Sequence, residues 1–441
     1  MTAEIVIMNK HSIALASDSA VTMIHGTSEK IKTSANKLFA LSKYHPIGIM
    51  VFGNADLMEI PWETIIKIYR NKLGEKKFDS MKEYADDFIA FLDNRNPLFP
   101  ESIQKEYLLS SVYGYFNFIK KEMEKEFDSV LTQKNEITQG EINEIISATI
   151  KKHYKRWKDA DIISSIPNTH IKDIADKFGE DIDKAIDEVF QRLPITKHRL
   201  NQLKEIAASL FLKFPKDIRK EGYSGVVIAG FGEKDTFPSF IAYDIDGVVN
   251  DRLKYRESSH DEISFESDAS VTAFAQKEMV VTFMEGIDPY YMEAEQNYLF
   301  ELFNEYTEMI IKYLMKENDK EKERIKKKLQ KSSEGILIDH LEKLKTYRQE
   351  RHINPVTSVV SMLPKDELAT MAETLVNLTS FARKVKLGPE TVGGPIDVAV
   401  ISKGDGFIWI KRKHYFKAEL NPQFFAKYYK EEFGNGDKIE K

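Results

Sequence analysis

The first eighteen residues constrain the fold of this 441-residue chain more than any other stretch. Ile5–Ile7 are strand-forming residues, and Ile13 and Leu15 repeat at a spacing of two. Between them, Asn9–His11 supplies the polar residues of a turn. The stretch therefore predicts a β-hairpin centred near Lys10, in which the numbers of paired residues sum to about 20.

This register places Thr2 opposite Asp18, within one residue step. Threonine is small enough to permit removal of the initiator Met1, which leaves Thr2 with a free α-amino group beside its hydroxyl. An α-amine titrates near pH ~8, so it can accept the proton of the hydroxyl next to it. A threonine that uses its own amine as the base is a known arrangement in hydrolases. The alternative interpretation is that Met1 and Thr2 are simply where the gene starts.

The segment Ile13–Thr22, with the sequence Ile-Ala-Leu-Ala-Ser-Asp-Ser-Ala-Val-Thr, resembles the opening of proteasome β-subunits and of the bacterial HslV-type protease. In that family an acid follows the N-terminal threonine after sixteen positions, and Asp18 lies sixteen positions after Thr2. The family then has a lysine at the start of the next strand. Lys37 in Asn36–Phe39 matches that lysine.

Later segments continue the resemblance. Ile47–Ala55 resembles the family's fourth strand, and Gly225–Gly247 resembles its central strand pair. Glu367–Lys386 matches the family's last helix, and Gly393–Phe407 matches its final strand pair. The resemblance implies an α+β fold. It is the four-layer αββα sandwich of N-terminal-nucleophile (Ntn) hydrolases, in which two antiparallel sheets pack face to face between outer helices.

The resemblance also implies roles for individual residues. Thr2 is the nucleophile, and Lys37 lowers the pKa of its amine. Asp18 keeps Lys37 charged, and the backbone N–H of Met50 stabilises the oxyanion. The family supports the threonine amine with a Ser-x-x-Asp-x-x-Ser arrangement split between two loops, which is out of register here. After a shift of one residue, Glu390–Thr391 can supply that support.

Pattern and turn residues predict the remaining elements near the site. A second hairpin turns near Tyr44–Pro46 and sets Lys37 beside Val51, so that two hairpins account for residues 1–55. The catalytic candidates then converge through strand pairing alone.

Helical periodicity predicts helices elsewhere in the chain. Residues 55–73 and 273–286 carry apolar residues at helical spacing, whereas the polar segment 251–270 is expected to be a loop. Two long helical stretches interrupt the core. The first of them has five predicted helices, which are Met81–Leu92, Ile103–Phe127, Gln139–Trp157, Ile171–Phe190 and Lys197–Phe214. The predicted segments are core 1–75, inserted helical bundle 76–213, core 214–290, helical insertion 291–350, core 351–415 and C-terminal helical tail 416–441.

Composition excludes several classes of function. The chain has no cysteine, which excludes disulfides, thiolate metal sites and a cysteine nucleophile. Its ten histidines form no zinc pattern, and no Walker-type phosphate loop is present, so we expect no metal and no cofactor. A net charge of −6 gives no drive toward nucleic acid. There is no apolar run of ~18 residues and no signal-peptide pattern, so we expect a cytoplasmic protein away from membranes.

We therefore interpret the chain as a threonine-type peptidase or amidohydrolase that works through an acyl-enzyme. The expected substrate is a peptide or a protein. The expected assembly is a homo-oligomer, and a ring is one possible form of it. A separate ATPase would unfold protein substrates where this is needed. The alternative is a catalytically inactive subunit of the same fold that acts as a scaffold or binding protein. A third interpretation is nucleic-acid binding through the basic and aromatic segment Lys151–Lys158, although a solvated face of an amphipathic helix is the simpler explanation.

Overall fold

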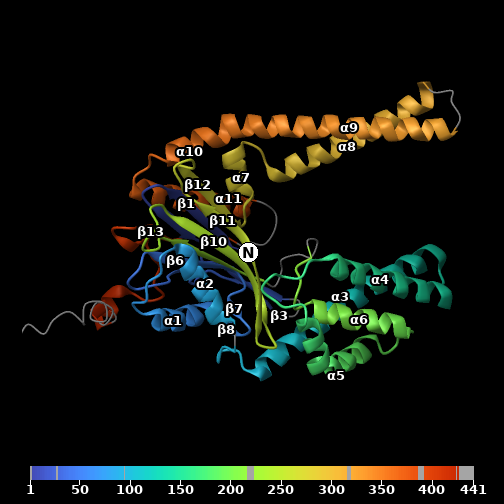
Figure 1. The fold of residues 1–441 in the computed structure, drawn as a ribbon, viewed down its shortest axis with the longest axis horizontal. Coiled ribbons are helices and arrows are strands. Elements are labelled where there is room, and N and C mark those ends of the chain that lie inside the picture. The colour runs from blue at the N-terminus through green and yellow to red at the C-terminus, as the bar shows by residue number, and fades with distance from the viewer. Residues whose placement is uncertain are drawn as a thin grey trace, which may run out of the picture. The chain divides into compact units, whose positions relative to one another are not determined.

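The computed structural model has an α+β fold with antiparallel sheets (Figure 1), and it describes residues 2–25, 28–93, 95–215, 223–314, 319–385, 392–423 and 425–426. The chain divides into two compact units. Unit 1 comprises Met1–Phe52, Ala229–Phe240 and Asp261–Lys441, and unit 2 comprises Gly53–Ile228 and Ile241–His260.

Unit 1 contains a five-stranded sheet with the strand order β12-β1-β2-β13-β14. Its strands are β1 (Ala3–Asn9), β2 (Ile13–Ser17), β12 (Ala269–Ala275), β13 (Asp397–Ser402) and β14 (Gly406–Lys411). Strands β1 and β2 form the predicted hairpin. Glu4 pairs with Ser17, so the register lies one step from the predicted centre. The Asn9 side chain closes the turn by accepting hydrogen bonds from the backbone N–H groups of His11 and Ser12, at 3.0 and 3.2 Å.

The two faces of this sheet pack against different elements of unit 1. Alternate residues of β1, such as Ile5, join an apolar cluster with Leu375 and other residues of α11 (Lys365–Val385). On the opposite face lies β6 (Ile47–Gly53), where a Cβ added to Gly48 would stand 2.9 Å from the side chains of both Leu15 and Ile401. Glycine is therefore the residue that allows β6 to approach the sheet this closely.

The second five-stranded sheet has the order β11-β10-β9-β6-β5. Its strands are β5 (Leu38–Ala40), β6 (Ile47–Gly53), β9 (Ser224–Gly230), β10 (Ser239–Val249) and β11 (Arg252–Glu262). Strands β5 and β6 form the predicted second hairpin, because Leu38 pairs with Met50. The Val51 N–H donates to the Lys37 carbonyl at 2.9 Å, which confirms that Lys37 lies beside Val51.

Unit 2 holds helices with a core of their own. They are α1 (Trp62–Leu73), α2 (Met81–Leu92), α3 (Glu101–Lys134), α4 (Gln139–Asp159), α5 (His170–Phe190) and α6 (Lys197–Ser209). Capping boxes at Ser80 and Thr138 begin α2 and α4 at the predicted positions. Buried residues such as Phe116 and Phe178 join α3 through α6 in one apolar cluster. Among the described residues, no helix is long and apolar enough to cross a membrane.

A long helical hairpin extends within unit 1, between α7 (Glu278–Glu285) and α10 (Asn354–Val360). Its two helices, α8 (Pro289–Leu314) and α9 (Asp319–Arg348), lie side by side (Figure 1) and are called the arm below. A short π-helix at Gln349–Ile353 joins α9 to α10.

Several sequence-based predictions near the sheets were wrong. A third hairpin, β3 (Val21–His25) with β4 (Ser28–Lys32), lies within residues 1–55. The helix predicted from residue 55 begins at Trp62, because residues 56–61 form the small strands β7 (Asp56–Leu57) and β8 (Ile60–Pro61).

The segment from 251 to 275 also differs from the prediction. The expected loop is largely β11, and the helix expected from residue 273 begins at Glu278 because Ala273–Ala275 pair with β1. Pairing with neighbouring strands outweighs local composition in both cases.

The α+β class with antiparallel sheets is confirmed, whereas the four-layer sandwich and the six segment boundaries stay predictions. Most of the predicted C-terminal tail lies outside the described residues.

Candidate functional site

Strand ends in unit 1 bring three of the predicted site residues together. Thr2 precedes β1, Asp18 follows β2 and Lys37 precedes β5. The Lys37 ammonium nitrogen donates to the Thr2 hydroxyl oxygen at 2.8 Å and to Asp18 Oδ1, also at 2.8 Å. It also donates to the Ala20 carbonyl. The first hairpin thus brings Thr2 close to Asp18, sixteen residues later in the chain, and the second hairpin places Lys37 beside both.

The backbone around Thr2 is held from both sides. The Gln276 N–H donates to the Thr2 carbonyl at 3.1 Å, as an extension of the pairing between β1 and β12. On the other side, the Asp18 N–H donates to the Ala3 carbonyl at 3.1 Å. Sheet hydrogen bonds therefore fix the backbone at Thr2, and the hydrogen bond from Lys37 holds its hydroxyl.

The Asp18 carboxylate is fully buried and accepts hydrogen bonds at both oxygens. The Ala3 N–H and Lys37 reach Oδ1, while the N–H groups of Ala20 and Gly393 reach Oδ2 at 3.2 and 2.9 Å. Donors converge from every side, and this is the environment that a carboxylate requires when it is buried. Asp18 therefore fixes the Lys37 ammonium rather than facing solvent.

Lys37 is 5% exposed, and burial lowers the pKa of its ammonium group. The neighbouring Asp18 acts in the opposite direction and limits that decrease. A lysine in this environment loses its proton more readily than an exposed one, and Asp18 helps to keep it charged.

The sequence analysis missed a fourth polar residue of the cluster, Glu4. Its side chain is fully buried, and burial raises the pKa of its carboxyl to about 8. Glu4 Oε1 accepts a hydrogen bond from the Ser17 hydroxyl at 3.2 Å, whereas Oε2 has no hydrogen-bond partner among the described residues. Glu4 lies two residues after Thr2 in a strand, so both side chains point to the same face, and this alternation was a signal available in the sequence.

A row of polar residues crosses the sheet at this level. Ser17 of β2 pairs with Glu4 on one side and with Asp397 of β13 on the other. Asp397 is buried and binds the side chain of Lys413. The positive charge of Lys413 also helps to lower the pKa of Lys37. Ser17 thus lies between two buried carboxyl groups in this row, those of Glu4 and Asp397.

Met50 is the remaining predicted site residue that the structure describes. Met50 is fully buried in β6. Because the Val51 N–H points toward β5, the Met50 N–H, one residue earlier, points to the opposite side of β6. Its role as oxyanion donor stays a prediction. Glu390 and Thr391, the predicted support for the amine, lie outside the described residues.

The cluster has the composition of a nucleophilic site. A hydroxyl lies within hydrogen-bond distance of a buried lysine, and a third group orients that lysine. Among the described residues, no group of three or more His, Cys, Asp or Glu side chains could hold a metal ion. The fold and site therefore define an antiparallel α+β protein with a buried Thr–Lys–Asp cluster.

Two solved structures that align with the chain are an Anbu (Gly-1) mutant from Hyphomicrobium sp. strain MC1 and Anbu (ancestral beta-subunit) from Yersinia bercovieri. The first has 8% sequence identity and a TM-score of 0.27, with 100% of each chain covered. The second has 8% identity and a TM-score of 0.27, with 99% of each chain covered. No protein-family model matches the chain, and neither does any curated protein.

These comparisons overturn the assignment of the chain to proteasome β-subunits and HslV-type proteases. No model of that family matches the sequence, and the two solved structures above are Anbu proteins. A TM-score of 0.27 does not establish a common fold with them either.

Proposed function

We propose that this chain is a threonine-type peptidase or amidase, in which removal of Met1 turns Thr2 into an N-terminal nucleophile. The observation that carries the proposal is the distance of 2.8 Å between the Thr2 hydroxyl oxygen and the Lys37 ammonium nitrogen, with Asp18 bound to the same ammonium group. A hydroxyl held this close to a cation is stabilised as it loses its proton.

The proposed reaction has two steps. In the first, the Thr2 amine takes the hydroxyl proton while the hydroxyl oxygen attacks the carbonyl carbon of an amide. The carbon–nitrogen bond breaks, the leaving amine departs with the proton, and the acyl group stays on Thr2 as an ester. In the second step, water gives a proton to the Thr2 amine and attacks the ester, which releases a carboxylic acid and restores the hydroxyl. Lys37 stabilises the developing alkoxide, and Asp18 holds Lys37 in place.

Two substitutions at Thr2 test the proposal with the size of the side chain held nearly constant. Thr2→Val replaces the hydroxyl by a methyl group, and Thr2→Ser keeps it; both residues are small enough for Met1 removal. We expect the wild type and Thr2→Ser to release amines from acyl-peptide amides, whereas Thr2→Val loses at least 100-fold in kcat/KM, in line with loss of a nucleophile. Intact mass should show loss of Met1 in all three proteins. It should also show an adduct with a threonine-directed covalent inhibitor in the wild type and in Thr2→Ser, but not in Thr2→Val.

Retention of Met1 in the purified wild type, or an adduct that forms equally well on Thr2→Val, would rule out the proposed nucleophile. Lys37→Met offers an independent check within the same cluster. Met1 should still be removed from this variant, but most of the inhibitor adduct should be lost, because the hydroxyl then lacks its neighbouring cation.

A second candidate function is that of a scaffold or binding protein without catalysis. The burial of Thr2, which is only 2% exposed, favours it, because a nucleophile must meet its substrate. This candidate predicts that Thr2→Val and the wild type behave alike in every assay above.

A further inference from the structure

The arm carries an apolar stripe on the side of α8 that faces away from α9. Its six side chains are each 53–71% exposed: Tyr291, Tyr298, Leu302, Tyr306, Met309 and Tyr313. At ~100° per residue they fall within ~80° of the helix circumference. The side of α8 that contacts α9 is formed by other residues, such as Phe303 and the buried Thr307.

This aromatic stripe is large for a surface without a partner. Four tyrosines, a leucine and a methionine at these exposures present on the order of 600 Å² of side-chain surface, which reaches the upper end of the largest patches on typical monomers. A standard interface buries about 800 Å² on each partner, so the stripe supplies most of one such surface.

The charges beside the stripe indicate what covers it. Glu301 and Glu305 are exposed next to Leu302 and Tyr306 on the same helix. Two stripes that packed against each other would place these carboxylates close together, which costs free energy. A basic partner surface would instead pair with the carboxylates and place cations over the tyrosine rings.

The same arm carries such a surface on α9. Its exposed basic residues are Lys320, Arg324, Lys327, Lys328 and Lys331, of which Arg324 and Lys327 also form ion pairs with Glu321 and Glu323 of the same helix. They fall within ~100° of the α9 circumference, at ~100° per residue. The side of α9 that contacts α8 is different, since it contains Lys326, which pairs with Glu308, and Gln330 and Leu337, which line the seam.

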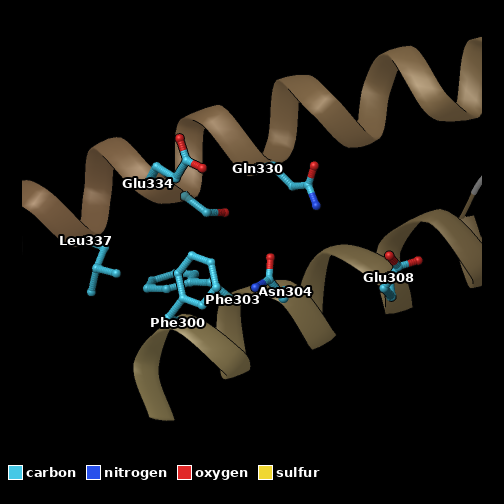
Figure 2. A pocket seen from close by; sticks show the side chains of 8 residues that line it. Phe300, Phe303, Asn304, Glu308, Gln330, Glu334 and Leu337 are labelled. Atoms are coloured by element: carbon cyan, nitrogen blue, oxygen red, sulfur yellow. The ribbon is translucent and has the colours of Figure 1, made fainter. Parts of the chain in front are cut away.

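The two surfaces also lie at the same level along the arm. A pocket of about 330 Å³ between the helices is lined by residues of both, and Figure 2 shows Asn304 of α8 and Gln330 of α9 facing the same space. The basic face of α9, which ends at Lys331, is therefore level with the half of the stripe from Leu302 to Tyr313. Two arms placed side by side in the same orientation would bring one surface against the other with no shift along the helix axis.

We propose that the arm is an interface between copies of this chain, in which the aromatic stripe on α8 of one copy packs against the basic face on α9 of a second copy. Such a contact joins two different surfaces, so it leaves one of each free and builds a ring or a filament rather than a closed pair. The proposal is independent of the hydrolase proposal, and Thr2→Val should assemble as the wild type does.

Charge reversal on the two helices tests the interface in solution. In sedimentation velocity over a concentration series, we expect the wild type to form species larger than a dimer. Lys327→Glu combined with Lys331→Glu should weaken association at least 10-fold, and so should Glu301→Lys combined with Glu305→Lys. An equimolar mixture of these two double variants should recover association, because the reversed surfaces match each other across copies.

Two further variants separate the interface from general effects of charge and folding. Lys343→Glu removes an exposed lysine on another side of α9 and should assemble as the wild type does. Tyr298→Ser combined with Tyr306→Ser should dissociate the assembly while circular dichroism shows unchanged helix content. A wild type that stays monomeric at ~100 μM, or a mixture that fails to recover association, would overturn the proposal, as would equal loss from Lys343→Glu.

Discussion

Glu4 is the residue that most changes the picture of the site. It is fully buried, with one carboxyl oxygen bound to Ser17 and the other without a hydrogen-bond partner among the described residues. Burial raises the pKa of this carboxyl, and the negative charge of Asp18 acts in the same direction, while Lys37 opposes both. An ionised Glu4 would compete with Thr2 and Asp18 for the charge of Lys37, so its protonation state sets how strongly Lys37 acts on the hydroxyl.

Replacement of Glu4 by glutamine should make stability less dependent on pH. The carboxyl pKa is raised from 4.5 to about 8 in the folded state, so the folded chain binds more protons than the unfolded chain between these values. The free energy of unfolding therefore falls as pH rises from about 4.5 to about 8. Glu4→Gln removes this loss. Relative to the wild type, its free energy of unfolding should rise by on the order of 2–4 kcal/mol across that window.

Denaturant titrations at pH 5, 6.5 and 8 measure this effect directly. The exposed Glu124→Gln serves as the matched control and should track the wild type at each pH. A difference between Glu4→Gln and the wild type that stays constant from pH 5 to pH 8 would contradict the raised pKa of the Glu4 carboxyl.

Much of the site could be predicted at this scale, for identifiable reasons. Thr2, Asp18 and Lys37 meet because two short hairpins have turns that the sequence marks clearly, and a register error of one residue did not separate them. The direction of the Met50 N–H could not be predicted from the sequence. The direction of a backbone N–H depends on which residues of a ladder exchange hydrogen bonds, and side-chain pattern does not reveal this.

At the scale of elements, local pattern succeeded where an element is amphipathic on its own. Helix α2 occupies the predicted residues 81–92, since its capping box and apolar spacing are both local. The prediction was wrong for strand β11 because its residues are largely polar and many are exposed, and only pairing with β10 makes the segment a strand. The prediction was also wrong for strand β12, because it too depends on a pairing partner, and that partner, β1, lies more than 250 residues earlier in the chain.

The arm offers a prediction at the scale of elements. The pocket at its seam has Phe300, Phe303 and Leu337 on its apolar side (Figure 2), and the small Ser333 of α9 also lines it. Ser333→Leu should fill part of this space and stabilise the pairing of α8 with α9 by about 1 kcal/mol. Hydrogen exchange of the α8 and α9 amides should slow by about fivefold, as such a free-energy change requires.

The neighbouring Ser332 provides the control, because it is exposed and does not line the pocket. Ser332→Leu adds the same side chain outside the seam and should leave the exchange rates of α8 unchanged. Equal protection from both variants would mean that helix propensity, rather than filling of the pocket, is responsible.

At the scale of the whole molecule, two apolar clusters of the described residues lie in different units. One joins β1, β2 and β13 to α11 in unit 1, and the other joins α3 through α6 in unit 2. The unit boundaries fall within β6, β9, β10 and β11, so these strands carry the covalent connections between the two units. Sequence periodicity revealed the helical bundle, but only the structure shows that the unit boundary runs through strands rather than through loops.

This arrangement predicts that each core can be destabilised on its own. Phe116 is fully buried in the core of α3 through α6, and Phe116→Ala should cost about 3–5 kcal/mol of local stability there. Hydrogen exchange followed by mass spectrometry should then show faster exchange in α3 through α6, with α11 unchanged. Leu375→Ala in the other core should give the opposite pattern, and the half-exposed Phe118→Ala should change little in either unit. If Phe116→Ala instead accelerates exchange equally in α5 and α11, the strands at the boundary couple the two cores into a single cooperative unit, and the division inferred from packing does not describe how the chain unfolds.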